Sequence, residues 1–405
     1  MNLNNPFRTL KHRNFRLLWS GEVLRTSSQW MDTITRGFLI YELTGSDAQL
    51  ALVNAARSAP LIVVGLIAGV LADRMSRKKL LMSSQTLNVL SHTAIAVLAF
   101  TGLVELWQVY VTVVIVGFGM GINVPARQSI IPTLVPEDDL QSAVVLNTAT
   151  LNIGMAVGPA IGGFIVGLAG IPVAFLVQAL MVGAAGMRIS RIESSEQPAR
   201  SHNGTSWWAS AVDGLQYVAR HRLLLPLFVI SLVPAILAQP FRGVVPAITV
   251  SQLMADATLT GLLMSALGIG ALVSVLALAS LPPSRHPWWQ IVISACVLGA
   301  GVAVFAVSRN LALSAAALFV VGVTQANNRT LTQSLLLAET EDGYRGRVSS
   351  LWVVNRGTLP LGSLLLAALT TTWGVTVAVA AMGLATTVLT MVMAARWRRV
   401  ETREG

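Results

Sequence analysis

The sequence is poor in charged residues and has almost no cysteine. Only 11% of its 405 residues are charged and 54% are hydrophobic, whereas a soluble domain carries roughly 25% charge. Its apolar runs are about 20 residues long, which is the length of a membrane-spanning helix, and the long polar–apolar alternation of membrane β-barrels is absent. The composition therefore predicts an all-α integral membrane protein. The lone cysteine, Cys296, excludes an internal disulfide.

Sequence motifs of common enzymes are absent as well. There is no Gly-x-x-x-x-Gly-Lys-Ser/Thr loop for nucleotide phosphates, no Cys/His cluster at metal-ligand spacing, and no evident pairing of a nucleophile with a base. We therefore expect no enzyme activity, no metal and no cofactor. The first residues, "MNLNNPFRTLKHRNFR", lack the layout of a signal peptide, so the first span is expected to remain in the protein.

Polar, glycine and proline clusters divide the chain into apolar segments of spanning length. Twelve are predicted, at 16–42, 48–72, 80–103, 107–131, 141–168, 171–187, 223–248, 258–281, 288–308, 311–337, 347–372 and 375–395. The net charge of +10 does not indicate nucleic-acid binding, because the basic residues gather at the two ends and in the turns after spans two, six and ten. This is the positive-inside pattern, and it places both termini in the cytoplasm.

The one long polar stretch divides the chain in two. We predict a six-helix bundle at 1–188, a cytoplasmic linker at 189–221 and a second six-helix bundle at 222–405. In the linker, Trp207, Trp208, Val212, Leu215 and Val218 recur near helical spacing, which predicts a short helix at the membrane surface. Asn152 and Gly154 recur 203 residues later as Asn355 and Gly357 (355 − 152 = 203), a weak sign of pseudo-symmetric halves.

The turn after span two carries a recognisable motif. It reads "GVLADRMSRKKLL", with Gly69, Asp73, Arg74, Arg77 and Lys78. This resembles the signature loop of the major facilitator superfamily, in which the aspartate and arginines latch the cytoplasmic side of the transporter. Serine replaces the family's second glycine here, which puts the shape of the turn in doubt because serine disfavours a left-handed backbone. The alternative reading is an ordinary basic cytoplasmic loop.

Span five carries a second motif. It reads "NIGMAVGPAIGG", with Gly154, Gly158, Pro159, Gly162 and Gly163. This resembles the antiporter motif of the same superfamily; the alternative is ordinary close packing of small residues. The stretches "LIYELTGS", "PARQSIIPTLVPEDDLQSAVVLN" and "GYRGRVSSLW" are similar to the subgroup of drug and siderophore exporters that includes macrolide and enterobactin exporters. The resemblance implies twelve helices in two bundles around a central cavity.

A polar stripe runs along the first span. It consists of Glu22, Arg25, Gln29, Asp32 and Arg36, which at 3.6 residues per turn share roughly a quarter of the helix surface. A charge facing lipid costs about 2.5–3.5 kcal/mol, so the stripe is expected to line a water-filled centre. Asp32 is the first candidate for proton coupling and Glu22 the second. The alternative is a permanent Asp32–Arg36 ion pair that only fixes helix packing.

Arginines outnumber acids inside the spans, which favours anionic or zwitterionic cargo. Arg127 and Arg242 are expected to be structural, and His92 is interpreted as a helix-packing residue in preference to a proton relay. The candidates for substrate contact are Gln29, Arg36, Asn54, Arg57, Asn355 and Arg356.

Together these features predict a secondary transporter. The resemblance implies a proton-coupled exporter of drug-like or siderophore-like molecules that works by alternating access in a bacterial inner membrane. Its expected partners are a small-molecule substrate, protons and membrane lipid, without nucleic acid, and it is expected to be a monomer. The alternatives are an importer or facilitator on the same fold, or a membrane scaffold or lipid-handling protein.

Overall fold

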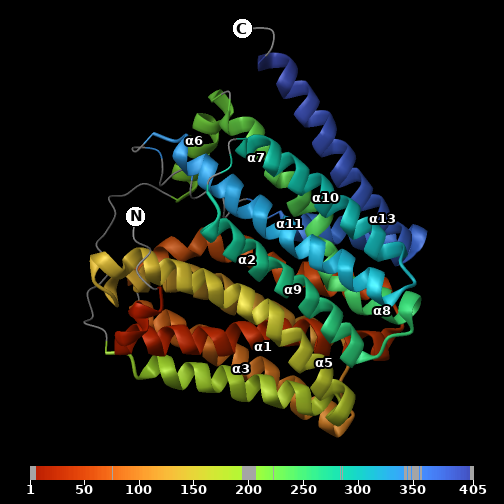
Figure 1. Ribbon diagram of the computed structural model, residues 1–405. Helices are drawn as coiled ribbons and strands as arrows, with labels where there is room; N and C mark the ends of the chain where they lie inside the picture. The colour runs from red at the N-terminus through yellow and green to blue at the C-terminus, as the bar shows by residue number, and fades with distance from the viewer. Residues whose placement is uncertain are drawn as a thin grey trace. The chain divides into compact units, whose positions relative to one another are not determined.

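The computed structural model describes residues 6–74, 76–193, 207–221, 223–282, 284, 286–341, 344, 348, 355 and 358–401. Within them, the side chains of residues 6, 61–63, 65–74, 207–212, 214, 279 and 398–401 are not described. The secondary structure of the described residues is entirely helical (Figure 1). Its main helices are α1 (Arg13–Thr44), α2 (Asp47–Arg74), α3 (Arg77–Thr101), α4 (Leu106–Ile130), α5 (Glu137–Ser190), α6 (Trp207–Arg220), α7 (Leu224–Val233), α8 (Val245–Leu253), α9 (Ala257–Ser280), α10 (Pro287–Val307), α11 (Leu311–Ala338) and α13 (Leu359–Glu401).

Seven segments of the described chain are long and apolar enough to cross a membrane. Two of them each consist of two helices joined at a glycine. The first, α5, has 54 residues and turns at Gly170 (φ 84°), and the second, α13, has 43 residues and turns at Gly374 (φ 77°). A positive φ is costly for residues with a side chain, so glycine sets both turning points. The boundaries predicted between spans five and six and between spans eleven and twelve are thereby confirmed.

Three further helices are of spanning length, and two of them, α1 and α3, are more polar. The three are α1, α2 and α3, with 32, 28 and 25 residues. Neither α1 nor α3 lies among the seven apolar segments, because both carry many polar side chains that the fold buries. A helix of this kind is sheltered by its neighbours and not by lipid.

The chain forms two compact units. Unit 1 contains residues 1–45, 56–204 and 256–265, and unit 2 contains 46–55, 205–255 and 266–405. The first nine residues of α2 thus belong to unit 2, and the first nine residues of α9 to unit 1.

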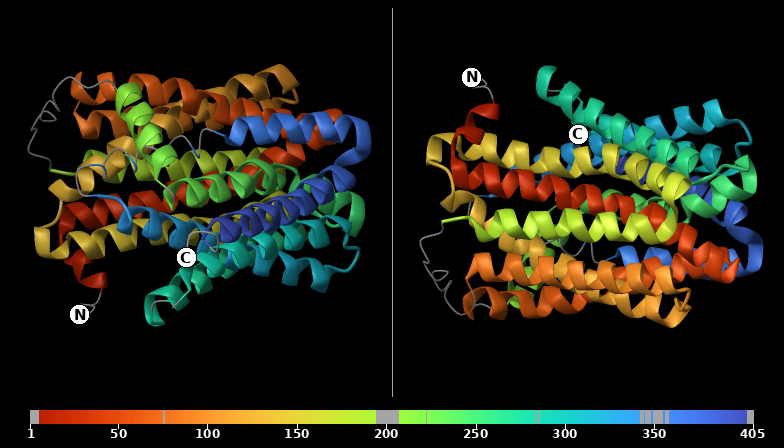
Figure 2. Two further views of the ribbon diagram at one scale, coloured as in Figure 1. Left: turned by 90° about the horizontal axis from the view of Figure 1, so that it is seen from above. Right: turned by 90° about the horizontal axis from the view of Figure 1, so that it is seen from below.

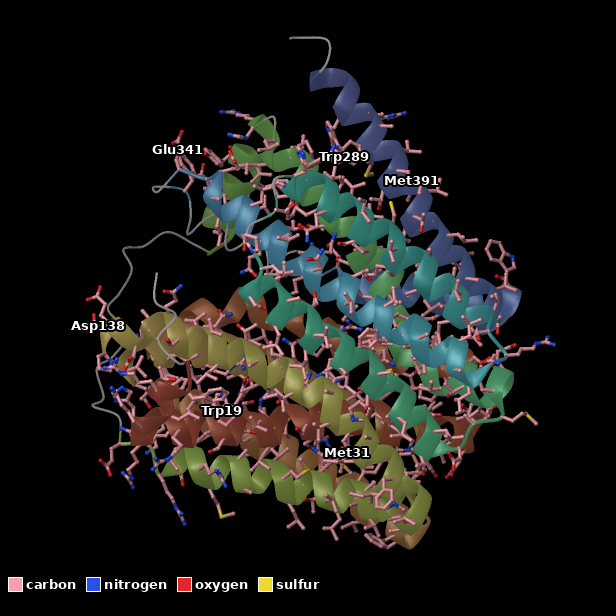
Figure 3. All side chains as sticks on the ribbon, in the orientation of Figure 1. Trp19, Met31, Asp138, Trp289, Glu341 and Met391 are labelled. Carbon is pink, nitrogen blue, oxygen red and sulfur yellow. The ribbon has the colours of Figure 1, made fainter. Side chains whose placement is uncertain are left out.

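In unit 1, α1 lies between the two arms of α5, which are residues 137–169 and 171–190 (Figure 2). The Trp19 indole N–H donates to the carbonyl of Leu146 on the first arm at 3.0 Å. On the other side, the Ser28 hydroxyl donates to the carbonyl of Gln178 on the second arm at 3.3 Å. Trp19 and Met31 mark the course of α1 in Figure 3. Both faces of α1 are therefore covered by one kinked helix.

The helix ends follow local sequence. Gly45 and Gly102 end α1 and α3 with φ of 57° and 69°, the left-handed conformation that glycine adopts without strain. Ser76 precedes α3 with an extended backbone (φ −63°, ψ 142°), and its hydroxyl accepts a hydrogen bond from the backbone N–H of Lys79 at 3.3 Å. The serine that departs from the family motif therefore serves as a helix cap.

In unit 2, α10 packs against α11 and α13. Gly299 of α10 and Gly383 of α13 face each other closely, since a Cβ at Gly299 would lie 2.5 Å from the carbonyl oxygen of Gly383. Between α7 and α8 the chain passes through a π-helix (Pro234–Ala238) and a 3-10 helix (Gln239–Val244). The span predicted at 223–248 is therefore interrupted at its middle, where three prolines lie at positions 234, 240 and 246.

The linker helix predicted from hydrophobic spacing is present as α6 (Trp207–Arg220). Val218 is fully buried, and the Tyr217 ring stacks on the ring of Tyr344 with centroids 4.2 Å apart. The Tyr217 hydroxyl accepts a hydrogen bond from the backbone N–H of Glu341. The helix thus packs on unit 2 through its last turns.

Candidate functional site

The predicted stripe on α1 is buried inside unit 1 and forms two clusters of charge. In the first cluster, the Arg25 guanidinium donates to both carboxylate oxygens of Glu22 at 2.5–3.0 Å and to the side-chain oxygen of Gln29 at 3.0 Å. Arg127 of α4 approaches Glu22 from the other side, with Nη1 2.7 Å from Oε1. Glu22 therefore lies between two arginines, and its side chain is only 2% exposed.

The second cluster surrounds Asp32. Arg36, one turn further along α1, donates to its carboxylate at 2.9–3.2 Å. Arg57 of α2 lies 3.2 Å from Oδ2, and Nε2 of His92 on α3 lies 3.5 Å from Oδ1. The Asp32 side chain is 1% exposed. Three basic side chains from three helices thus converge on one buried carboxylate.

The second cluster is anchored at Arg36. Its Nη1 donates to the hydroxyl of Thr112 on α4 at 3.1 Å, and its guanidinium carbon lies 5.2 Å from the ring centroid of Phe175 on α5. A guanidinium over an aromatic face gains cation–π attraction, which is larger in desolvated surroundings. Arg36 is therefore held from α4 and α5 as well as by Asp32.

The stripe and the arginines that contact it from α2 and α4 carry more positive than negative charge. Glu22 and Asp32 supply two negative charges, and the basic side chains beside them are Arg25, Arg36, Arg57 and Arg127. With neutral histidine the set is +2 (4 − 2 = 2), all within unit 1. Such an excess attracts anions and repels cations.

The glycines of the span-five motif make the close approach of α1 to α5. A Cβ at Gly154 would lie 2.7 Å from Cβ of Thr26, one at Gly158 would overlap the carbonyl oxygen of Ser27, and one at Gly162 would lie 2.9 Å from Met31. The next residue, Gly163, fits against the backbone of Ala257. The Ser265 hydroxyl accepts a hydrogen bond from the backbone N–H of Ala160, the residue after Pro159, at 3.1 Å.

Only part of the predicted cytoplasmic gate can be described. The side chains of Gly69, Asp73 and Arg74 lie outside the described set, although their backbone belongs to α2. Lys78 donates to the carbonyl of Ile192 at 2.7 Å, while Nε of Arg77 is buried with no hydrogen-bond partner among the described residues.

The acids after span four, Glu137, Asp138 and Asp139, are by sequence possible partners of Arg74 or Arg77. Instead, Asp139 is bound by the N-terminal residues His12, Lys11 and Arg8, at 2.7, 3.4 and 3.9 Å. The hydrogen bond from His12 and the charges of Lys11 and Arg8 hold the pKa of Asp139 below its usual value, against a smaller effect of burial. The N-terminal end of α5 is thus tied to the residues before α1.

The remaining predicted contacts belong to unit 2 or lie beyond the described residues. Asn54 donates to the carbonyls of Leu50 and Gly243 at 2.8 and 3.3 Å. Asn355 is buried and donates to the Ser231 hydroxyl at 3.0 Å. Arg356 lies outside the described residues. Arg57 is thus the one predicted substrate contact beyond α1 that the structure brings to the Asp32 cluster.

Sequence reasoning missed two members of the site. Arg127 was expected to be structural, and it pairs with Glu22. His92 was interpreted as packing, and it lies beside Asp32. For His92 a sequence pattern could have shown this. On the third span, Gln85, Asn88 and His92 repeat the spacing of three and four residues that identified the stripe on α1.

Among the described residues no group of His, Cys, Asp and Glu could hold a metal ion. The clusters instead offer two buried carboxylates, each held by basic side chains from more than one helix.

Comparison with known proteins identifies the family of the chain. The family model described as "Transmembrane secretion effector" matches residues 4–404. The staphyloferrin A transporter of Staphylococcus aureus is 23% identical over 377 residues, covering 92% of this chain and 94% of the relative. The multidrug efflux pump Tap of Mycolicibacterium fortuitum is 30% identical over 275 residues, covering 66% of each chain. The enterobactin exporter of Citrobacter koseri is 24% identical, covering 86% and 82%.

Solved structures show the same fold. A POT family transporter crystallised with 5-aminolevulinic acid superposes with a TM-score of 0.74 at 13% identity, covering 96% of both chains. The match covers nearly all of the chain, as does the family model. The chain is therefore a multi-pass membrane transporter of small molecules, not an enzyme, and it belongs to the transmembrane secretion effector family, in the drug and siderophore exporter subgroup of the major facilitator superfamily.

Proposed function

We propose that this chain is a proton-coupled exporter of small molecules in a bacterial inner membrane, with Asp32 as the coupling acid and Glu22 as a second acid. The observation that carries the proposal is the convergence of Arg36, Arg57 and His92 on one buried carboxylate. Burying that many charges is costly, and a purely structural ion pair needs only two of them.

The exporter alternates between states open to either side of the membrane. Protonation of Asp32 releases its basic partners, and they become available to cargo or to each other. Deprotonation gathers them again. The protonmotive force supplies about 2.3 kcal/mol per charge and 100 mV, enough to favour one arrangement strongly.

The cargo is anionic or zwitterionic. The two acids of α1 and the four arginines beside them from α1, α2 and α4 have a net charge of +2 (4 − 2 = 2), which supports this assignment because a positive site repels cations. In the second half, Arg242 lies in the 3-10 helix Gln239–Val244 and Arg329 in α11, and neither helix contains an acid. Relatives named for siderophores fit a cargo rich in negative charge.

The remaining site assignments follow from position. The proposed cargo contacts, in addition to Arg36 and Arg57, are Gln29, Asn54, Asn355 and Arg356. The loop from Gly69 to Lys78 is the proposed cytoplasmic latch, and both termini are proposed to face the cytoplasm. The exporter is proposed to work as a monomer made of bundles 1–188 and 222–405, joined by the linker 189–221.

The test is efflux from cells that overproduce the protein, with enterobactin, a macrolide and ethidium as probes. Each probe is measured with and without a protonophore, for the native chain, Asp32→Asn and Glu193→Gln at matched expression. Glu193 is an exposed acid paired with Arg13, so its loss is the control for removing a carboxylate. We expect gradient-dependent efflux of enterobactin, lost in Asp32→Asn and kept in Glu193→Gln.

Two outcomes contradict the proposal. Efflux that persists with the gradient collapsed removes proton coupling. Normal efflux by Asp32→Asn makes the Asp32–Arg36 pair structural and moves the coupling role to Glu22. Uptake of a probe into energised cells would instead identify an importer on this fold.

A further inference from the structure

A second set of buried polar side chains lies beside the charged stripe in unit 1. Gln85, Asn88 and His92 follow each other on α3 at spacings of three and four residues, and Asn123 lies on α4. Their relative exposures are 2%, 5%, 3% and 1%. Spacing of this kind puts the three α3 side chains on one face of the helix. The clusters around Glu22 and Asp32 do not explain why amides are buried here.

These amides have polar atoms without partners in the described structure. Both side-chain atoms of Gln85, both of Asn123 and the side-chain oxygen of Asn88 are buried and make no hydrogen bond there. A buried polar group left unsatisfied costs about 1–3 kcal/mol, so several such groups in one place need a common partner. Internal water is the usual one, because a water molecule satisfies two to four buried polar atoms at once.

Contacts between α3 and α4 order His92, Asn88 and Asn123 between the two acids, and Gln85 lies one turn before Asn88 on α3. At one end, the His92 Nδ1–H donates to the carbonyl oxygen of Asn88 at 2.7 Å, and Nε2 faces Asp32 at 3.5 Å. The Asn88 side chain lies against Gly119 of α4, where a Cβ would be 3.1 Å from its oxygen. The next turns of α4, about 5.4 Å apart, carry Asn123 and then Arg127, which binds Glu22.

The tautomer of His92 follows from its contacts. A carbonyl oxygen only accepts, so Nδ1 of His92 carries a proton, and Nε2 is the ring nitrogen that faces Asp32. A proton taken up at Nε2 forms an N–H bond there. That bond breaks as an O–H bond forms on Asp32, and His92 returns to the same neutral form. One proton enters and one carboxyl is formed, with no other change.

We propose that Gln85, Asn88 and Asn123 hold internal water that carries protons between the Glu22 cluster and His92–Asp32 inside unit 1. The inference rests on the proposed coupling role of Asp32 and adds the route by which its proton arrives. The charged groups along that route are Arg25 and Arg127 at Glu22, and Arg36 and Arg57 at Asp32. Around them α5 contributes the neutral Phe175 and Gln178.

Hydroxyl-radical footprinting of the purified protein tests the water itself, because radicals formed from internal water label the side chains that touch it. We expect labelling of His92 despite its burial. Met31, which is 0% exposed and packed on Gly162, is the dry control and is expected to stay unlabelled. Asn123→Leu is expected to lower the labelling of His92 toward that of Met31, and Asn123→Ser to keep it. A dry His92 in the native protein overturns the proposal.

Proton uptake after a rapid pH drop, followed with a soluble pH dye, tests the relay. The Asp32-dependent part of the proton uptake is the uptake by the native chain minus the uptake by Asp32→Asn. We expect Asn123→Leu and Gln85→Leu to slow that part by about 100-fold, the low end of what a positioned proton-transfer group contributes, with unchanged amplitude and with recovery in Asn123→Ser. Two blocking variants on different helices guard against misfolding of one.

The outcomes separate the two proposals. Equal rates in all variants, with an Asp32-dependent amplitude present, overturn the relay and leave the coupling role intact. An uptake that is the same in native and Asp32→Asn removes the coupling role and the relay together.

Discussion

At the scale of single residues, the stripe on α1 depends on matched charge. Glu22 and Asp32 are each held by basic groups from two or three helices. Loss of one partner from a buried ion pair leaves the other charge in a poorly solvating interior, which costs far more than loss of an exposed pair. The described residues contain pairs of both kinds, so the comparison can be made within a single protein.

Glu22→Gln should destabilise the protein by about 3–5 kcal/mol, because Arg25 and Arg127 then lie buried without a carboxylate. Glu193→Gln removes a pair whose side chains are 57% and 78% exposed, and it should cost at most about 1 kcal/mol. Unfolding in detergent micelles, followed by tryptophan fluorescence, measures both. Equal losses in the two variants would show that the Glu22 cluster is solvated.

The contacts of Asp139 predict an acid-sensitive link at the N-terminal end of α5. Its folded-state pKa lies below the ordinary value of 3.8, so the stability it contributes is present above that value and is lost as the pH falls through the lowered pKa. The midpoint temperature of thermal unfolding should therefore fall more steeply below pH 3.8 for the native chain than for Asp139→Asn. Parallel profiles for the two proteins would exclude the contact in solution.

At the scale of helices, α5 is both scaffold and spacer. Its three glycines at 154, 158 and 162 leave room for the backbone of α1, and Gly170 turns the chain so that the second arm covers the opposite side. Small residues at four-residue spacing allow this approach.

Gly158→Ala should therefore separate α1 from α5, because the new methyl overlaps the Ser27 carbonyl. Overpacking of this kind costs about 1–3 kcal/mol. Gly183→Ala in the same helix is the matched control, since its nearest neighbour atom is 4.0 Å away, and it should be neutral or stabilising because alanine favours helix. Thermal unfolding of the two variants measures these changes in stability. An unchanged stability of Gly158→Ala would mean that α1 and α5 are not closely packed at this position.

The same elements show how far sequence reasoning reaches. Periodicity located α1, its stripe and the turns at residues 170 and 374, because each depends on local spacing or on one glycine. The roles of Arg127 and His92 depended on which helices meet around α1, and one-dimensional spacing does not contain that information. Asp139 likewise found partners more than 120 residues away, in a segment before the first span.

At the scale of the whole molecule, the distribution of charge predicts the topology. Lys79 lies in the basic first turn of α3, and Arg309 lies in the turn between α10 and α11. By the positive-inside rule they belong to opposite sides of the membrane. Since the chain has one cysteine, Cys296→Ser gives a cysteine-free background for testing this.

In that background, Arg309→Cys should react with an impermeant maleimide in cells whose outer membrane has been removed and whose inner membrane is intact. Lys79→Cys should react only after the inner membrane is opened. Both positions are exposed, so differences in labelling report sidedness and not burial. The reverse pattern would place the termini outside.

The position of α1 between the arms of α5 also has a consequence for synthesis. The ribosome completes α1 at Thr44, and the first residue of α5 is Glu137, 93 residues later (137 − 44 = 93). During that interval the ionic stripe has none of the cover that α5 provides. A helix so charged enters lipid poorly by itself. The insertion machinery therefore has to retain the first helix while the next three are made, and release it when the fifth arrives.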